Sequence, residues 1–290
     1  MRISTGHKFE TMTSQLQRTQ SELEALRRQV ISGRRFESAR QDPTAARTVL
    51  SATAMQNRLD SLGKNIQSAR GQIGPAEQAL AEVSRMLDQA HGFGLQANNA
   101  TAGSEERQTL ANQVQSLMDR LVQIGNTKDA QGGSVFAGSR TQADAFALDA
   151  GDLVYQGDGL PRRVEIEPGR MIDANLAGAD AHFTKLHSSL GELKDAILTG
   201  RTDEALAKVE SGRRENLAAR GELGVRLQTL TETQQRHQNR IDDLSEQIGD
   251  ARDIDLAEAM TRYEQANTAY TAALQMTGRL SDLSLMDFLR

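Results

Sequence analysis

The chain has 290 residues, with no Cys, no Trp, four Pro and ten aromatic residues. Without Cys it has no disulfide, no thiolate nucleophile and no Cys-based zinc or iron–sulfur site. Its net charge of −5 argues against a general nucleic-acid binder. Because aromatic residues are scarce, Leu, Ala, Ile, Val and Met must fill the interior. These side chains suit the narrow seams between paired helices better than a wide globular core.

The charge is unevenly distributed along the chain. Residues 1–50 carry nine basic and five acidic side chains, whereas residues 241–290 carry four basic and ten acidic ones. Opposite charge at the two ends favours their pairing with each other. The amino end has no apolar core of the kind found in secretory signal peptides, and no window approaches 18 consecutive apolar residues. We therefore expect export without a cleaved signal peptide, if the protein is exported, and no membrane insertion.

Apolar residues in the first 30 positions recur at alternating steps of three and four, with one polar interruption at Thr19. This is the spacing of a coiled-coil seam. The pattern ends at Ser32-Gly33, and Asp42-Pro43 is typical of a helix start, with Asp as the cap and Pro in the first helical position. The residues predicted to form an N-terminal assembly seam are Phe9, Met12, Leu16, Leu23, Leu26 and Val30.

A second helix is predicted over residues 55–87, where the apolar positions again alternate steps of four and three. Gly74-Pro75 interrupts this segment without shifting its register, which indicates a kink or a short restart. A turn-rich stretch is predicted over residues 91–103. A third amphipathic helix then begins near Ser104 and carries apolar residues as far as Ile124.

Helical spacing disappears between residues 134 and 184. The alternating pieces Val154-Tyr155 and Val164–Glu167 lie between Gly- and Pro-containing turns and predict short strands. Helical spacing resumes near Leu186 and is interrupted once more around residues 200–203. The element order is therefore helices, strands and again helices.

This order predicts a mainly α-helical fold. We expect an elongated antiparallel helical rod with paired N- and C-terminal coiled-coil helices and a small β-rich inserted domain. The expected domains are terminal helices at 1–44 and 250–290, a helical core at 45–133 and 185–249, and the insertion at 134–184.

The last helical segments carry two polar seam positions, Gln234 and Asn267. Each is either a tolerated polar position or a determinant of helix register, and the pattern leaves both readings open. The residues predicted to form a C-terminal assembly seam are Leu256, Met260, Tyr263, Tyr270, Leu274, Leu285 and Phe288.

Motifs that carry chemistry are few. The segment Gly92–Ala97 matches the dinucleotide fingerprint Gly-x-Gly-x-x-Ala, but no predicted strand precedes it, so a tight connection between helices is the better interpretation. The five His form no pair at i, i+4, and we expect His237 in a seam and His182 and His187 on the solvated surface. We predict no catalytic, cofactor-binding or metal-ligating residue, no cofactor and no enzyme activity.

The ordered motifs of the chain resemble the flagellin family. The individual motifs are short, but together they span nearly the whole chain in the order typical of that family. They are Met1-Arg2-Ile3-Ser4-Thr5, the segment Ser32–Ala46, Val154–Asp158, Arg220–Leu227, Asp253–Thr261 and Ser284–Leu289.

The resemblance implies a structural protein that polymerises in the bacterial flagellum and forms the junction between hook and filament. It implies secretion through the flagellar type III apparatus, without a cleaved signal peptide, and terminal helices that are mobile in the free subunit. The implied partners are further copies of the chain, neighbouring axial proteins (another hook-associated protein and flagellin) and an export chaperone that binds the C-terminal region.

Two alternatives remain. The first is a filament subunit, which the short insertion disfavours. The second is a coiled-coil signalling module of the chemoreceptor type, which explains the heptads and the acidic charge but not the predicted strands.

Overall fold

The computed structural model describes residues 2–98 and 103–288, and it describes the side chains between Glu10 and Gly278 within these ranges. The described residues form six helices and two separate two-stranded antiparallel sheets. The chain divides into two compact units, one built from residues 1–57 and 240–290 and the other from residues 58–239. The predicted fold class, mainly helical with a small β-rich insertion, is confirmed.

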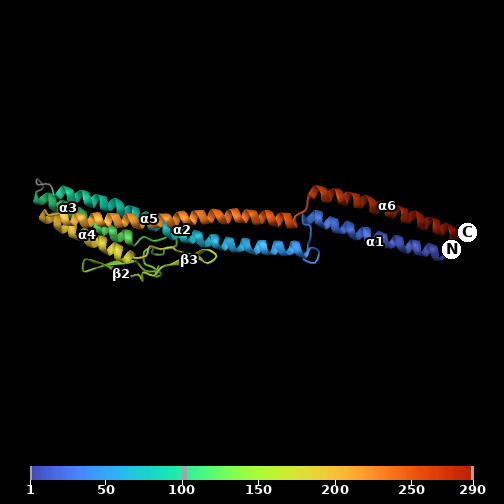
Figure 1. Ribbon diagram of the computed structural model, residues 1–290, viewed down its shortest axis with the longest axis horizontal. Helices are drawn as coiled ribbons and strands as arrows, with labels where there is room; N and C mark the ends of the chain where they lie inside the picture. Colours follow the sequence, from blue (N-terminus) through green and yellow to red (C-terminus); the bar gives the residue numbers. More distant parts are fainter. Residues whose placement is uncertain (1, 99–102, 289–290) are drawn as a thin grey trace. The chain divides into compact units, whose positions relative to one another are not determined.

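The first unit pairs the two ends of the chain. Helix α1 (Arg2–Ser32) and helix α6 (Leu256–Phe288) lie side by side (Figure 1). The unit also contains the start of α2 (Pro43–Ala97) and the end of α5 (Asp203–Arg252). The Gln56 amide joins these two segments, since Nε2 donates to the Ile241 carbonyl at 3.2 Å and to Ser245 Oγ at 2.8 Å.

The apolar seam predicted for α2 is largely buried. Met55 is 43% exposed, but the other predicted positions are buried because they face the neighbouring helices every three or four residues. The buried positions are Leu59, Leu62, Ile66, Ala69, Ile73, Ala76, Leu80, Val83 and Leu87. Helix α2 continues through Gly74-Pro75, so the helix does not restart there.

The turn-rich stretch predicted from residue 91 is wrong as far as Ala97, where α2 ends. The cause is a close contact at Gly94, where an added Cβ would lie 2.6 Å from Leu206 Cδ2 and 2.9 Å from Leu193 Cδ1. Glycine therefore lets the last turns of α2 pack directly on α4 (Ala179–Thr199) and α5, and this contact outweighs the low helix propensity of glycine. The segment Gly92–Ala97 is thus helical and does not follow a strand, as a nucleotide-binding turn would.

Helix α3 (Ser104–Gly125) and helix α4 (Ala179–Thr199) pack against each other in the second unit. The predicted interruption between α4 and α5 is confirmed. It begins at Gly200, whose φ of +71° places it in the left-handed region that commonly ends helices. The Gly200 backbone N–H donates to the Ile197 carbonyl at 3.2 Å.

Both predicted strands are present, and each pairs with a strand that the sequence pattern missed. Strand β1 (Phe146–Asp149) pairs with β2 (Asp152–Tyr155), and β3 (Arg163–Glu167) pairs with β4 (Arg170–Asp173). The register aligns Phe146 with Tyr155 and Val164 with Ile172. The β1–β2 hairpin lies next to α4, and the β3–β4 hairpin lies beside α2 (Figure 1).

An aromatic cluster joins the insertion to the helices. The rings of Phe136 and Phe146 lie 4.9 Å and 5.0 Å from the ring of Phe183, which α4 supplies, and all three side chains are fully buried. The Tyr155 ring lies 5.3 Å from Phe146. The β-rich segment therefore shares its core with α4 rather than enclosing one of its own.

This shared core gives a first prediction. Because Phe183 is fully buried between two other rings, Phe183→Ala should lower the free energy of unfolding by about 3–5 kcal/mol. Urea unfolding followed by circular dichroism measures the loss. The control is Leu198→Ala on the same helix, where the side chain is 45% exposed and the loss should stay below about 1 kcal/mol. Equal losses for the two variants would contradict the shared core.

Candidate assembly surfaces and their polar anchors

The predicted N-terminal seam lies on the α1 face that is partly covered. Within the described part of α1, from Glu10 to Ser32, no side chain is fully buried, and Ile31 is 76% exposed. Phe9 lies outside the described side chains. The half-buried seam residues are Met12, Leu16, Leu23, Leu26 and Val30.

The predicted C-terminal seam is split between two environments. Tyr263 and Tyr270 are half-buried, whereas Leu256, Met260 and Leu274 are 51%, 50% and 43% exposed. Leu285 and Phe288 lie outside the described side chains. The described part of the helix pair thus leaves these three apolar side chains in contact with solvent.

The connectors that join α1 to α2 and α5 to α6 are paired with each other. Arg34 and Asp253 form an isolated antiparallel β-bridge. The Arg35 backbone N–H donates to the Arg252 carbonyl at 2.7 Å, and the Ile254 N–H donates to the Gly33 carbonyl at 3.1 Å. The helices on both sides of the first unit are therefore interrupted at the same level. There the two connectors hydrogen-bond to each other through their backbones.

The Arg35 side chain fixes this paired joint. Its Nη2 donates to the Ala251 carbonyl at 2.9 Å and lies 3.3 Å from Asp42 Oδ2. The other carboxylate oxygen of Asp42 accepts the Ala45 N–H at 2.9 Å, which caps α2 as the sequence predicts. The role of Arg35 was missed, because its partner at Ala251 lies more than 200 residues away in the chain.

A buried polar network links α2, α4 and α5 in the second unit. Asn216 is fully buried, and its Nδ2 donates to the Leu80 carbonyl and to Ser84 Oγ, both at 2.8 Å. Its Oδ1 lies 3.0 Å from His182 Nε2. The Asn216 amide nitrogen donates to α2, so the contact with His182 is made by the amide oxygen, which can only accept a hydrogen bond. His182 Nε2 therefore carries the hydrogen.

Two histidines are not where the sequence placed them. His182 is half-buried and His187 is only 6% exposed, so their prediction as solvated surface groups is wrong. Helix α4 packs on α3 and also bonds to α5, so its His-bearing face is covered. Burial lowers the pKa of both imidazoles below the ordinary value.

His237 occupies the α5 seam, as predicted. It is 6% exposed, and its Nδ1 is buried without a hydrogen-bond partner. Burial lowers the pKa of His237, while the Glu167 carboxylate acts in the opposite direction and the neighbouring Arg236 adds to the lowering.

Two polar clamps cross between α2 and α5. Arg220 donates from Nε at 3.1 Å and from Nη2 at 2.8 Å to Glu77 Oε1. Arg70 donates from Nη1 to Gln234 Oε1 at 3.0 Å and also bonds Thr231. The polar seam position Gln234 is thus half-buried and has a partner on the opposite helix.

The β3–β4 hairpin is anchored to α2 and α5 by side chains of those helices. Asn65 donates to the Glu165 carbonyl at 2.9 Å, and Arg226 donates to the carbonyls of Asp173 and Asn175 at 3.0 Å and 2.7 Å. Arg236 donates to Glu167 at 2.9 Å. Hydrogen bonds from Arg170 and Arg236 hold the pKa of the Glu167 carboxyl below its ordinary value.

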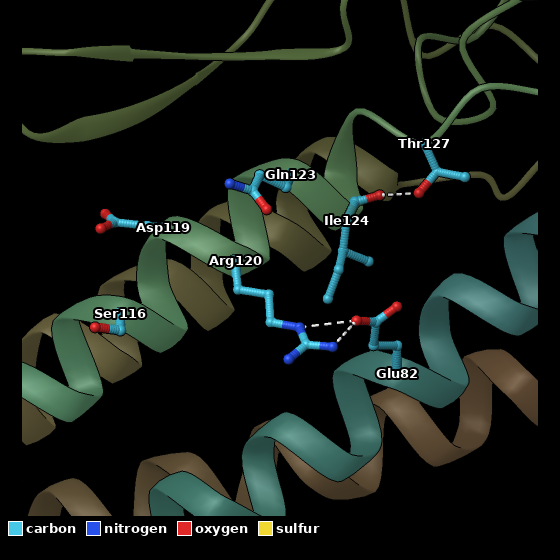
Figure 2. A pocket seen from close by; sticks show the side chains of 7 residues that line it. All are labelled: Glu82, Ser116, Asp119, Arg120, Gln123, Ile124 and Thr127. Atoms are coloured by element: carbon cyan, nitrogen blue, oxygen red, sulfur yellow. Dashed lines mark hydrogen bonds and ion pairs between the residues drawn. The ribbon is translucent and has the colours of Figure 1, made fainter.

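A surface pocket of about 500 Å³ lies between α2 and α3 (Figure 2). Arg120 spans it and donates from Nε to Glu82 Oε1 at 2.8 Å, and the Asp119 carboxylate also lines the pocket. Across the residues that the structure describes, no group of three His, Asp or Glu side chains is placed to hold a metal ion. No helix in the described ranges is long and apolar enough to cross a membrane.

Two family models match the chain. The model of the bacterial flagellin N-terminal helical region matches residues 3–141, and that of the bacterial flagellin C-terminal helical region matches residues 200–289. These ranges contain α1, α2 and α3 on one side and α5 and α6 on the other.

Relatives with curated names match over different lengths. Flagellar hook-associated protein 3 of Escherichia coli K12 is 25% identical over 98% of this chain and 98% of its own. Flagellar hook-associated protein 3 of Salmonella typhimurium LT2 is 24% identical over the full length of both chains. Flagellin B of Vibrio cholerae is also 24% identical, but the match covers 65% of this chain and 54% of that protein.

Solved structures share the fold. The flagellar hook-associated protein 3 of Legionella pneumophila superposes with a TM-score of 0.63 at 15% identity, over 70% of this chain and 98% of that one. A FlgL structure from Bacillus cereus gives a TM-score of 0.58 at 19% identity, over 69% and 97%.

The buried histidines predict a dependence of stability on pH. Because burial lowers the pKa values of His182, His187 and His237 in the folded chain, the unfolded chain binds more protons below its own His pKa of about 6.5. Stability should therefore fall as the pH falls from about 7 to about 5. His237→Leu removes one contribution, so the unfolding free energy should depend less steeply on pH.

Urea unfolding at several pH values measures this slope. The control is Gln234→Leu, which removes a half-buried polar side chain from the same helix without removing a titrating group. It should keep the wild-type slope. If the unfolding free energy of His237→Leu depended on pH as steeply as that of the wild type, the predicted contribution of His237 would be contradicted.

Proposed function

The chain belongs to the flagellin family, and on this premise we propose that it is a structural protein of the flagellar axis that forms the junction between hook and filament. The proposal rests on the share of each relative's length that the match covers. Both hook-associated relatives are covered almost completely, whereas Flagellin B is covered over about half its length. A filament subunit of that kind has long segments for which this chain has no counterpart.

Polymerisation through the terminal helices is the second part of the proposal. It is supported by the incomplete burial of α1 and α6, whose described residues include one fully buried side chain, Ala259. A helix pair with so little buried surface gains much of its stability when further copies cover its outer face. The N-terminal and C-terminal seam residues are the positions that neighbouring subunits would cover.

The partners follow from this place in the flagellum. We infer that the chain contacts further copies of itself, another hook-associated protein and flagellin, and that an export chaperone binds its C-terminal region before secretion. The role is structural and includes no catalysis and no cofactor. In support, the basic side chain that lines the pocket between α2 and α3, Arg120, is engaged in an ion pair with Glu82.

The two alternatives are less well supported. The match to the filament subunit Flagellin B covers 54% of that protein, so its remaining length has no counterpart in this chain. A chemoreceptor-type module explains neither the two β-hairpins nor the matches to both flagellin helical regions.

Limited proteolysis of the purified monomer tests the mobile ends. About 40 residues at each end should be removed first, because α1 and α6 hold few buried contacts, while the second unit should survive. Mass spectrometry of the fragments locates the cleavage sites. Termini as resistant as residues 58–239 would contradict the prediction.

Deletion of the gene in its host tests the junction role. The mutant cell should build a hook, carry no filament and release filament protein into the medium, which electron microscopy and identification of the released protein detect. Leu23→Asp, which puts a charge into the half-buried α1 seam, should fail to restore filaments, whereas the exposed neighbour change Glu24→Gln should restore them. Filaments that remain attached in the deletion strain would exclude the junction role.

A further inference from the structure

Residues that weaken helices occur at one level of the α2–α5 pair. Helix α2 carries Gly71, Gly74 and Pro75, and α5 carries Gly221 and Gly224. The two polar clamps set the alignment of the helices, since Arg70 bonds to Thr231 and Gln234 while Glu77 bonds to Arg220. The Gly and Pro residues of α2 and the Gly residues of α5 therefore lie in the same short section of the helix pair, between the two clamps.

Intramolecular packing does not require glycine at these positions. A Cβ added to Gly71, Gly74, Gly221 or Gly224 would meet nothing within 4 Å, and none of the four has a positive φ. Gly212 is a contrasting case, since a Cβ there would lie 2.6 Å from Leu186 Cδ2. Alanine would fit the open positions and would favour the helix more strongly than glycine does.

Pro75 weakens the same section in another way. It has no backbone N–H, so the Gly71 carbonyl four residues earlier receives no helical hydrogen bond from it. Proline residues and pairs of Gly or Ser are among the few established causes of sharp bends in helices. Helix α2 therefore combines a missing hydrogen bond with two flexible residues within about one and a half turns.

The neighbouring elements brace α5 on both sides of this section. On one side α4 holds α5 through the Lys185–Glu215 ion pair and the His182–Asn216 hydrogen bond. On the other side the β3–β4 hairpin holds it through Arg226 and Arg236.

The section of α5 between these braces is open. Leu217 and Val225 are each 65% exposed. A surface pocket of about 460 Å³ lies alongside and is lined by α5 residues between Glu215 and Glu222, by the start of α4 and by residues 176–178. Solvent therefore reaches this section of α5 directly.

We propose that residues 71–75 of α2 and 221–225 of α5 form a hinge at which the helix pair bends, while the braced sections on either side stay rigid. The apolar seam stays closed through the hinge, because Ile73, Ala76 and Leu223 are fully buried there. The motion is thus a bend of a packed pair and not a local unfolding. This hinge goes beyond the proposed function and does not depend on it.

The absence of Cys allows a direct test by spin labelling of the full chain. Labels at Asp60→Cys and Gln89→Cys, both exposed on α2, enclose the hinge and the control position Gly63 at a helical separation of about 44 Å. Pulsed electron paramagnetic resonance then measures the distribution of label distances. Substituting Ala at Gly71, Gly74, Gly221 and Gly224 should narrow that distribution by roughly twofold, because alanine restricts the backbone.

The matched control is Gly63→Ala. Gly63 is also a helical glycine of α2 with open space around its Cβ position, but it lies outside the two clamps. It should leave the width unchanged. The pair Gly221→Ala with Gly224→Ala, and Pro75→Ala alone, serve as smaller variants, each checked for wild-type helix content by circular dichroism. The proposal would be overturned if the distribution of label distances were as wide in every folded hinge variant as in the wild type. It would also be overturned if Gly63→Ala narrowed that distribution as much as the hinge variants do.

Discussion

The narrow seam between α2 and α5 is the contact on which the second unit depends. It is filled by aliphatic side chains and closed by the Arg70 and Arg220 clamps. The one fully buried amide in it, Asn216, has partners for its nitrogen and its oxygen, as a buried polar group must. The α3–α4 layer and the β3–β4 hairpin are bonded to this pair, whereas the β1–β2 hairpin packs on α3 and α4. A shift of the two helices along each other would therefore break several of these anchors at once.

The sequence predicted the parts of the fold that periodicity determines. Nearly all the apolar positions of the 55–87 segment are buried, because a helix that packs along its length must present a side chain every three or four residues. It did not predict contacts between distant segments. The continuation of α2 to Ala97 depends on Leu193 and Leu206, and the burial of His187 depends on where α4 packs. In strands β1 and β4 the apolar residues are adjacent, Phe146–Leu148 and Met171-Ile172, so the alternation that indicates a strand is absent.

The two units differ in how completely they bury apolar side chains. In the second unit, residues such as Phe183, Leu190 and Leu121 are fully enclosed, whereas the described part of α1 encloses none. The sequence predicts the seam positions, but its pattern does not show whether a seam is buried by other helices of the same chain or by another copy of the chain. Both kinds follow the same heptad spacing. The difference is visible only once the neighbours of each helix are known.

The paired connectors have a mechanical consequence. Two peptide segments, one after α1 and one before α6, pass through the joint, and the bridge between Arg34 and Asp253 ties them together beside the Arg35 guanidinium. Tension applied to the terminal helices is therefore shared by two covalent strands loaded in parallel. The hydrogen bonds between the two segments hold them at one register, so neither segment can extend alone without breaking these bonds.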